Sequence, residues 1–348
     1  MKDLKYLWAY TAPLAAFLGI YYGGIWSPGA IYVGFGIIPL VELFNKGTTK
    51  NLTADEEVSK LSNRFFDWML YLNVPILFAL LVYYFVTIQA GGLSTGEIVG
   101  MTCSVGLIVG TIGINVAHEL GHRDTWQEQW LSKLLLMTAL YMHFFIEHNR
   151  GHHKNVATDL DPASARYGEN LYAFWLRSTF WSYLDAWKLE NNRLRKMGKH
   201  PISWENEMIW LQIFQLLYLG TVGWLFGTAM IGFAVAVAIF GFLLLETVNY
   251  VEHYGLRRQQ LASGRYEKVS PRHSWNSNHE LGRIFLYELT RHSDHHYKAN
   301  RKYQVLRHLD TSPQLPHGYP VSMLLSLVPP LWFAIMNKEV KRFRGSLA

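Results

Sequence analysis

The chain has 348 residues, of which half are hydrophobic and only 17% are charged. Soluble domains carry about a quarter charged residues, so this composition indicates a protein that lies partly in a membrane. The 32 basic against 26 acidic residues are too diffuse to indicate a nucleic-acid-binding protein. The single cysteine, Cys103, excludes a disulfide framework, a CxxC zinc site and an iron–sulfur cluster. The N-terminal MKDLKYLWAY lacks a small-residue cleavage site, which predicts a retained first helix.

Six apolar stretches are candidates for membrane crossing, which takes about 20 mostly apolar residues. The first four run over residues 7–22, 30–44, 65–88 and 98–117. A later stretch over residues 209–248 is too long for one crossing, and we expect it to divide near residues 223–227, where glycines permit a tight turn. The expected fold class is therefore an all-α integral membrane protein with six transmembrane helices.

The distribution of basic residues predicts the orientation of these helices. Lys and Arg are absent from the connections GGIWSPG, QAGGLSTGE and GWLFGTA. The opposite helix ends are flanked by Lys2, Lys5, Lys46, Lys50, Lys60 and Arg64. Because basic residues concentrate in cytoplasmic loops, we expect both termini in the cytoplasm and three short loops outside.

Two further apolar segments are ambiguous. Residues 131–146 form either a seventh span or a helix that is cytoplasmic or lies at the membrane interface. We prefer the second interpretation, because a crossing would place the histidines on either side of this segment on opposite membrane faces. The C-terminal run over residues 321–336 is interrupted by Pro329 and Pro330, so we expect it at the interface or on a cytoplasmic cap. The predicted divisions are transmembrane helices one to four (1–122), a cytoplasmic segment (123–208), helices five and six (209–253) and a C-terminal cap (254–348).

The first histidine cluster is HELGH, where the fourth predicted span ends. His118 and His122 lie four residues apart and share one helix face, so they can bind one metal. By itself this is the HExxH pattern of a zinc protease with Glu119 as the base.

The second cluster, EHNRGHH, begins at Glu147. His148 and His152 again lie four apart, whereas His153 is rotated by about 100° from its neighbour on an ideal helix. We therefore expect His153 to reach a different metal, or the helix to break near Gly151.

The third cluster, RHSDHH, contains His292, His295 and His296, which an ideal helix places on one face. His253 stands at the predicted cytoplasmic exit of the sixth span. On this topology nine histidines converge on the inner membrane face, which is too many for one ion and predicts two metals with four or five ligands each. These candidate ligands are His118, His122, His148, His152, His153, His253, His292, His295 and His296.

Nine neutral imidazoles leave the charge of two divalent ions uncompensated, so carboxylates are expected to orient the rings from behind. Glu246 lies in the last turns of an apolar span, where an ionisable residue is either functional or a simple helix-end residue. The candidates for this role are Glu119, Glu147, Glu246, Glu252, Asp294, Asp159 and Asp161. The remaining histidines are interpreted as ordinary polar residues: His143, His200, His273, His279, His308 and His317.

The sequence resembles the membrane-bound alkane 1-monooxygenases, within the fatty-acid desaturase/hydroxylase superfamily. The resemblance covers nearly the whole chain and rests on HELGHR at 118–123, EHNRGHH at 147–153, NYVEHYGL at 249–256 and RHSDHH at 291–296. NYVEHYGL separates this family from the acyl desaturases. Arg123 departs from the lysine expected in many members.

The resemblance implies a non-haem di-iron centre that uses O2 to hydroxylate the terminal methyl of medium-chain n-alkanes to primary alcohols. It implies electrons from a rubredoxin with its flavin-containing reductase, which an excess of basic cytoplasmic residues suits. It also implies a multi-pass protein of the bacterial inner membrane, with lipid around it and the active site in a cytoplasmic helical cap.

Three alternative functions are distinguished by the substrate or by the arrangement of histidines that each would require. A related di-iron fatty-acyl desaturase or hydroxylase would take an acyl substrate. A zinc protease built on HELGH would leave the other histidine clusters unexplained. A metal transporter would spread its histidines across the bilayer, whereas here they gather on one face.

Overall fold

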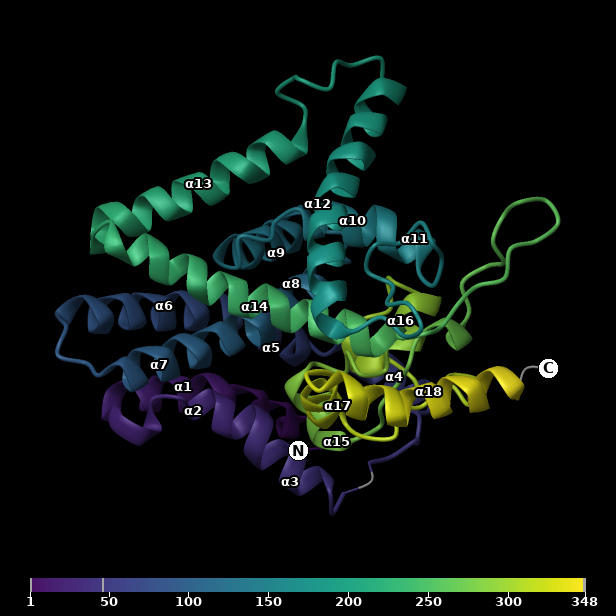
Figure 1. Ribbon diagram of the computed structural model, residues 1–348, viewed down its shortest axis with the longest axis horizontal. Helices are drawn as coiled ribbons and strands as arrows, with labels where there is room; N and C mark the ends of the chain where they lie inside the picture. Colours follow the sequence, from purple (N-terminus) through teal and green to yellow (C-terminus); the bar gives the residue numbers. More distant parts are fainter. Residues whose placement is uncertain (1, 46, 347–348) are drawn as a thin grey trace.

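The computed structural model describes residues 2–45 and 47–346, so Lys46 lies outside the described residues. These residues form helices and no strand; only two isolated bridges pair extended backbone (Figure 1). The N-terminal part consists of η1 (Lys2–Tyr10), α1 (Thr11–Tyr22), η2 (Gly24–Trp26), α2 (Gly29–Ile31), η3 (Tyr32–Ile37), α3 (Ile38–Glu42) and α4 (Ala54–Ser62).

Four helices are long and apolar enough to cross a membrane: Phe65–Ala90, Thr95–Gly121, Glu207–Phe226 and Ala229–His253. The first joins α5 (Phe65–Tyr71) to α6 (Asn73–Ala90), the second joins α7 (Thr95–Ile108), η4 (Val109–Asn115) and α8 (Val116–Gly121), and the last two are α13 and α14. They match four of the six predicted spans. The other two, over residues 7–22 and 30–44, contain short 3₁₀, α and π segments, so the count of six stays a prediction.

The three connections without basic residues lie together at one end of the molecule. Figure 1 shows the α1–α2, α6–α7 and α13–α14 turns at the left end of the bundle. The side chain of Glu97 accepts hydrogen bonds from the backbone N–H of Gly24 (2.7 Å) and Ser94 (2.9 Å), which ties two of these turns together. Gly227 separates α13 from α14 with φ of 89°, which only glycine adopts readily, so the predicted division of this apolar stretch is confirmed.

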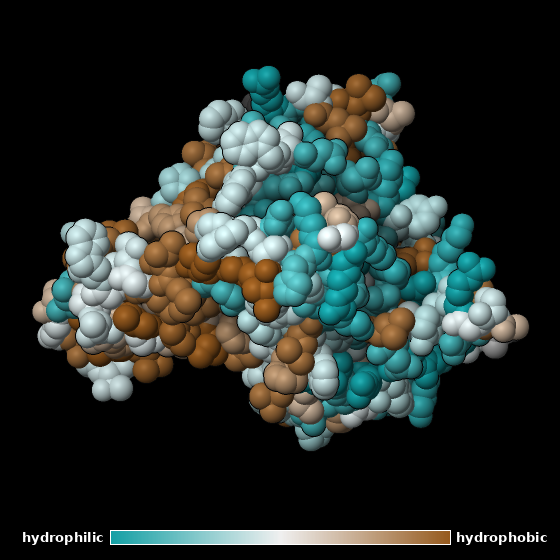
Figure 2. Space-filling model, turned by 90° about the horizontal axis from the view of Figure 1, so that it is seen from above, coloured by the Kyte–Doolittle hydropathy of each residue, from teal (hydrophilic) through white to brown (hydrophobic). Residues whose placement is uncertain are grey.

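Hydrophobic and hydrophilic residues are distributed unequally between the two ends of the molecular surface. In Figure 2 most of the strongly hydrophobic residues lie in the left half, which contains these turns, and hydrophilic residues predominate in the right half. Large apolar side chains such as Trp224 (82% exposed) lie on the hydrophobic half, where a water-soluble protein would leave polar residues. This division fits a membrane part and a cap.

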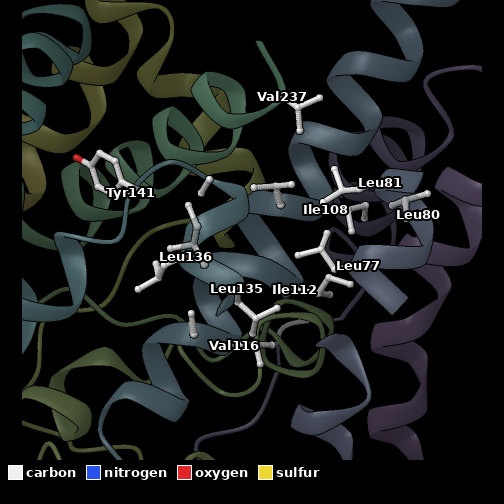
Figure 3. Close-up of a cluster of buried hydrophobic side chains, with 14 of the residues drawn as sticks. Leu77, Leu80, Leu81, Ile108, Ile112, Val116, Leu135, Leu136, Tyr141 and Val237 are labelled. Carbon is white, nitrogen blue, oxygen red and sulfur yellow. The ribbon is translucent and has the colours of Figure 1, made fainter. Parts of the chain in front are cut away.

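The apolar core joins α6, the α7–α8 helix, α9 (Trp126–Thr138) and α14. Figure 3 shows side chains of these helices pointing toward one another, whereas the hydroxyl of Tyr141 points away from them. Glycines let α7 and η4 approach α14 closely, because a Cβ on Gly106 would lie 2.7 Å from Cβ of Phe240 and one on Gly110 would lie 2.7 Å from Cδ2 of Leu244.

The segment 131–146 is not one continuous helix. Helix α9 ends at Thr138, Leu140 adopts φ of 50°, and α10 (Phe144–Glu147) begins four residues after Leu140. Because a crossing takes about 20 residues, this break supports the predicted cap helix over a seventh span. It is followed by η5 (His148–His152), α11 (His153–Asn155) and the long α12 (Leu171–Lys196).

The chain ends in a cap of short helices around the inner ends of the bundle. They are η6 (Pro271–His273), α15 (Glu280–Phe285), α16 (His292–Tyr297), η7 (Tyr303–Val305), α17 (Tyr319–Ser326) and α18 (Pro329–Gly345). The expected interruption falls between α17 and α18, and Trp332, Met336 and Val340 pack α18 against α14 and α12 residues rather than exposing it.

The contact of α7 with α14 predicts the effect of a glycine substitution. Gly106→Leu would force Phe240 to move, and overpacking of this kind costs about 1–3 kcal/mol. Gly220→Leu is the matched control, because an added Cβ there meets no atom within 4 Å. Thermal unfolding of both variants in detergent should show a lowered midpoint for Gly106→Leu alone; equal midpoints would contradict this packing.

Candidate metal centre

Four helical segments bring the nine predicted histidines to the inner end of the bundle. His118 and His122 lie at the end of α8, and His253 is the last residue of α14. The second cluster lies on η5 and the start of α11, and the third on α16. All nine side chains are buried or half-buried in the structure.

The nine histidines form two groups, in each of which the ligand atoms all lie within 4.8 Å of one another. The five-histidine group contains His118, His122, His148, His153 and His295. The four-histidine group contains His152, His253, His292 and His296. The division into four and five ligands has the size expected for two metal ions.

The second cluster divides differently from an ideal helix. Nε2 of His148 lies 3.0 Å from Nε2 of His153, five residues on, whereas His152 turns to the four-histidine group. The cause is that residues 148–152 form a π-helix, whose i→i+5 bonding brings residues five apart onto one face. The expectation that His153 reaches a different metal from His152 agrees with this geometry, but the sharing of one face by His148 and His152 does not lead to a shared group.

The third cluster also contributes to both groups. His292 and His296 lie four apart on α16 and belong to the four-histidine group, whereas His295 faces the five-histidine group. Nε2 of His295 lies 2.9 Å from Nε2 of His118 and 3.1 Å from Nε2 of His153. Helix α16 thus lies between the two groups. Of its three histidines, which were expected on one face, His292 and His296 face the same group and His295 faces the other.

The spacing of the ring nitrogens fits metal ligation better than hydrogen bonding. Nε2 atoms of His122, His148 and His153 lie 3.0–3.2 Å from one another. A neutral imidazole has one N–H, so three such atoms cannot all be paired as donors and acceptors. Two nitrogens that each lie about 2.1 Å from one ion, at right angles, are about 3.0 Å apart. The donor set therefore fits a metal ion.

Burial keeps these rings in the form that binds metals. Loss of solvation, and to a smaller extent the neighbouring His152, lower the pKa of His122 to about 3. Burial and then neighbouring histidines also hold the pKa well below its ordinary value for His148, His153, His292, His295 and His296. Neutral imidazoles at neutral pH offer free lone pairs without losing a proton.

Two contacts select the tautomer in the four-histidine group. Nδ1 of His152 donates to Oδ2 of Asp161 at 2.9 Å, and Nδ1 of His253 donates to the carbonyl of His273 at 3.4 Å. Each leaves Nε2 unprotonated and aimed at the group. Sequence reasoning found Asp161 but missed His273, because a backbone carbonyl carries no sequence signal.

Other predicted carboxylates are buried beside the histidines. Oε2 of Glu252 lies 3.1 Å from Nε2 of His292, and its Oε1 accepts from the hydroxyl of Tyr319 at 2.9 Å. Glu246 accepts from Tyr141 at 2.8 Å. Burial, and then Asp161 and Asp185, raise the pKa of Glu147 well above its usual range. A buried carboxylate without a cationic partner fits nearby divalent ions.

Three predicted carboxylates have different partners. Glu119 pairs with Arg123 at 2.8 Å and accepts from the backbone of Tyr303, and Asp294 pairs with Arg307 at 3.0 Å. They support the helices that carry the ligands. Asp159 is 71% exposed and pairs with Arg257, so it does not reach the histidines.

An apolar cavity of about 80 Å³, here called the chamber, ends at both histidine groups. His118 and His148 of the first group and His292 of the second line its inner end. Its other walls come from η1, α1, η3, α3, α7, η4, α14, α15 and α17, and two of these, η3 and η4, are π-helical.

The sequence is similar to a family profile and to several known enzymes. The fatty acid desaturase family profile matches residues 95–324, which include all nine histidines. Alkane 1-monooxygenase 2 of Pseudomonas aeruginosa is 41% identical over 98% of this chain and 89% of its own length. Alkane 1-monooxygenase 2 of Alcanivorax borkumensis is 39% identical over 99% of this chain and 92% of its own length. The xylene/toluene monooxygenase hydroxylase component XylM of Pseudomonas putida is 29% identical over 98% of this chain and 90% of its own length.

The two neighbouring aspartates allow a matched test of ring orientation. Asp161→Asn removes the charged acceptor of the His152 N–H, so it should weaken metal binding by about 10–100-fold. Asp159→Asn changes an exposed carboxylate two residues away and should leave binding unchanged. Competition titration with a chelator measures both; equal affinities would refute the role of Asp161.

Single ligand substitutions test the two groups separately. His122→Ala and His296→Ala should each lower the metal content measured by mass spectrometry, because each removes a ligand from one group. His200→Ala is the control, because His200 is exposed and hydrogen-bonds only near its own turn. Full metal content in either ligand variant would show that the grouping is wrong.

Proposed function

Because the chain belongs to the alkane 1-monooxygenase family, we propose that it is an integral-membrane di-iron monooxygenase that hydroxylates the terminal methyl of medium-chain n-alkanes to primary alcohols. The observation that carries this proposal is the chamber, whose apolar walls end at histidines of both groups. Its substrate is therefore a slender apolar molecule that presents one end to the metals.

The nine histidines hold two iron ions, one in each group. When bound, these ions supply the activation of O2, with electrons delivered from a donor protein. Imidazole nitrogens suit iron as well as zinc or copper, and the family membership supports iron. The buried carboxylates around the groups offset the charge of the ions, and Asp161 orients His152 toward its ion.

The chain positions the alkane by shape, because an alkane offers no hydrogen bonds. Polar groups on the chamber wall are engaged by the protein itself: Nδ2 of Asn115 donates to the carbonyl of Leu286 at 2.9 Å, and the Thr111 hydroxyl donates to the carbonyl of Leu107 at 2.9 Å. Such a wall holds little water and admits a narrow chain end-on. The methyl at the leading end then lies beside His118, His148 and His292.

These 348 residues contain one cysteine, which cannot form the four-thiolate site of a rubredoxin, so the electron donor of the proposed reaction lies outside them. A rubredoxin, reduced by its reductase, is the proposed donor. Lys154 directly follows His153, and Lys298 directly follows α16; both are exposed. Basic residues next to the ligand segments suit an acidic donor protein.

The proposed setting is the bacterial inner membrane, with six spans, both termini and the metal site on the cytoplasmic side. The 3₁₀-helix η1 rises about 2.0 Å per residue, so η1 and α1 together are long enough to cross despite the short α1. The side-by-side position of the three turns that lack Lys and Arg supports one common outer face. The divisions 1–122, 123–208, 209–253 and 254–348 remain the proposed organisation.

Product analysis by gas chromatography tests the activity. Purified protein in nanodiscs receives iron, rubredoxin, its reductase, NADH, O2 and a mixture of octane and dodecane. We expect 1-octanol or 1-dodecanol, formed only with O2 and iron present. The His122→Ala variant serves as the control and should form none.

The absence of alcohol from an iron-loaded protein that accepts electrons would contradict the proposal. Acyl substrates would then be tried, because the match to the fatty acid desaturase profile includes all nine histidines. An unsaturated or hydroxylated acyl product would assign the alternative fatty-acyl desaturase or hydroxylase function.

A further inference from the structure

Arg150 lies within the second histidine cluster, and its side chain points away from the rings. It is in the middle of η5, where its side chain is 37% exposed, whereas His148 and His152 are buried. On this far side two carboxylates bind its guanidinium. Nη1 donates to Oε2 of Glu190 at 2.8 Å, and Nη2 donates to Oε2 of Glu207 at 3.2 Å.

The two carboxylates come from two other helices. Glu190 lies near the end of α12, and Glu207 is the first residue of α13. A planar guanidinium presents separate N–H groups to each carboxylate, in a fixed fork that a lysine ammonium lacks. One side chain of η5 is thus held by two helices that carry none of the nine histidines.

Glu190 is fully buried, and both of its oxygens are satisfied. Oε2 also accepts from Nε of Arg193 at 2.8 Å. Oε1 accepts from Nη2 of Arg193 at 2.6 Å and from the backbone N–H of Glu207 at 2.9 Å. Burial by itself would raise the pKa of Glu190, but these hydrogen bonds and the charges of Arg193 and Arg150 hold that pKa below its ordinary value. Glu190 is therefore an anion at neutral pH, fixed at the α12–α13 connection.

Glu207 extends the ion network to the helix behind the first histidine cluster. Its Oε1 lies 2.6 Å from Nζ of Lys133 on α9. Helix α9 packs on α8, where the hydroxyl of Ser132 donates to the carbonyl of Ala117 at 2.6 Å, next to His118. The network therefore connects η5 to a helix that already supports other candidate ligands.

The segment η5 also packs closely on α12. A Cβ on Gly151 would lie 3.0 Å from Cδ1 of Leu189 and 3.1 Å from Oδ2 of Asp185, both on α12. Figure 1 shows α12 passing beside α10 and α11, the elements on either side of η5. Helix α12 thus supports η5 at two successive residues, through the ion pair of Arg150 and through the close contact at Gly151.

The helical register of residues 148–152 decides which group each histidine joins. In an α-helix residues four apart share a face, which would bring His148 and His152 together. The π-helical register instead brings Nε2 of His148 within 3.0 Å of Nε2 of His153. A π-helix turns less per residue than an α-helix. Rewinding η5 to an α-helix would therefore rotate Arg150 relative to His148 and draw its guanidinium from the two carboxylates.

We propose that Arg150 is a positioning residue of the metal centre. Held by Glu190 and Glu207, it fixes η5 in the π-helical register. That register in turn directs His153 to the five-histidine group and His152 to the four-histidine group. This inference rests on the proposed function, because it takes both groups to be metal sites. The ion network acts from the side of η5 that faces away from the rings, so it sets their direction without contacting a metal.

Substitution of Arg150 tests this role. Arg150→Gln leaves Glu190 paired with Arg193. It also leaves Glu207 paired with Lys133, so neither acid loses its only cation. We expect ferrous iron to bind to this variant about tenfold more weakly than to the wild type, in a chelator competition titration of the protein in nanodiscs. Arg150→Lys keeps the charge without the planar fork, so its affinity should lie between the two.

Arg193→Gln is the matched control. It removes an arginine from the same carboxylate, but the other partner of Arg193 is the carbonyl of Glu205, and neither contact involves a segment that carries a histidine ligand. The iron affinity of this variant should equal that of the wild type. Equal weakening in Arg193→Gln and Arg150→Gln would assign the network a general structural role and overturn the inference.

A double-mutant cycle gives a readout that general destabilisation would not change. His153→Ala and His118→Ala each remove one ligand from the five-histidine group, but only His153 directly follows η5. In the Arg150→Gln background the loss of iron affinity caused by His153→Ala should shrink by about threefold, whereas the loss caused by His118→Ala should stay the same. Arg150→Lys carries the same cycle if Arg150→Gln does not fold. Additive effects at both histidines would contradict the proposal.

These measurements separate the inference from the activity. Weaker iron binding in Arg150→Gln, coupled to His153, in a protein whose wild type forms no alcohol would support the inference and count against the proposed function. Alcohol formation by the wild type, with unchanged iron affinity in Arg150→Gln, would overturn the inference and leave the proposed function in place.

Discussion

The structure depends on burying nine imidazole rings at the inner ends of apolar helices. A buried polar group without a partner costs about 1–3 kcal/mol, and three Nε2 atoms within 3.2 Å of one another cannot all be satisfied by hydrogen bonds. Metal binding removes that cost, because each lone pair then has a ligand bond. Metal binding in the two groups would therefore be coupled to the folding of η5, α11 and α16, which carry the second and third histidine clusters.

The same helices carry the candidate histidine ligands and form the walls of the chamber. The glycines of α7 and η4 let α14 approach closely, which brings His253 to the same end as His118 and His122. The same two helices line the chamber, so the helices that carry the candidate ligands also form walls of the proposed substrate site. Local departures from α-helix occur where the function needs them: η3 and η4 border the chamber, and η5 carries His148 and His152.

Much of this arrangement could be predicted from the sequence, because it follows from length, charge and spacing. The apolar runs of four helices, the turn at Gly227 and the gathering of nine histidines at one end agree with the structure. The division of the histidines into groups could not be predicted in full. It depends on the π-helix at 148–152, which no residue pattern announces, and on α16 lying between the two groups. The role of the His273 carbonyl and the distance of Asp159 from the rings depend on tertiary packing in the same way.

The central claim is that two iron ions are bound in unequal sites, one of five histidines and one of four. Mössbauer spectroscopy of the purified protein, loaded with ⁵⁷Fe and reduced, tests it most directly. The account predicts two ferrous doublets of equal area and different quadrupole splitting, because the two ligand sets differ in number. A single doublet, or iron content that supports only one occupied group, would contradict the unequal two-site centre.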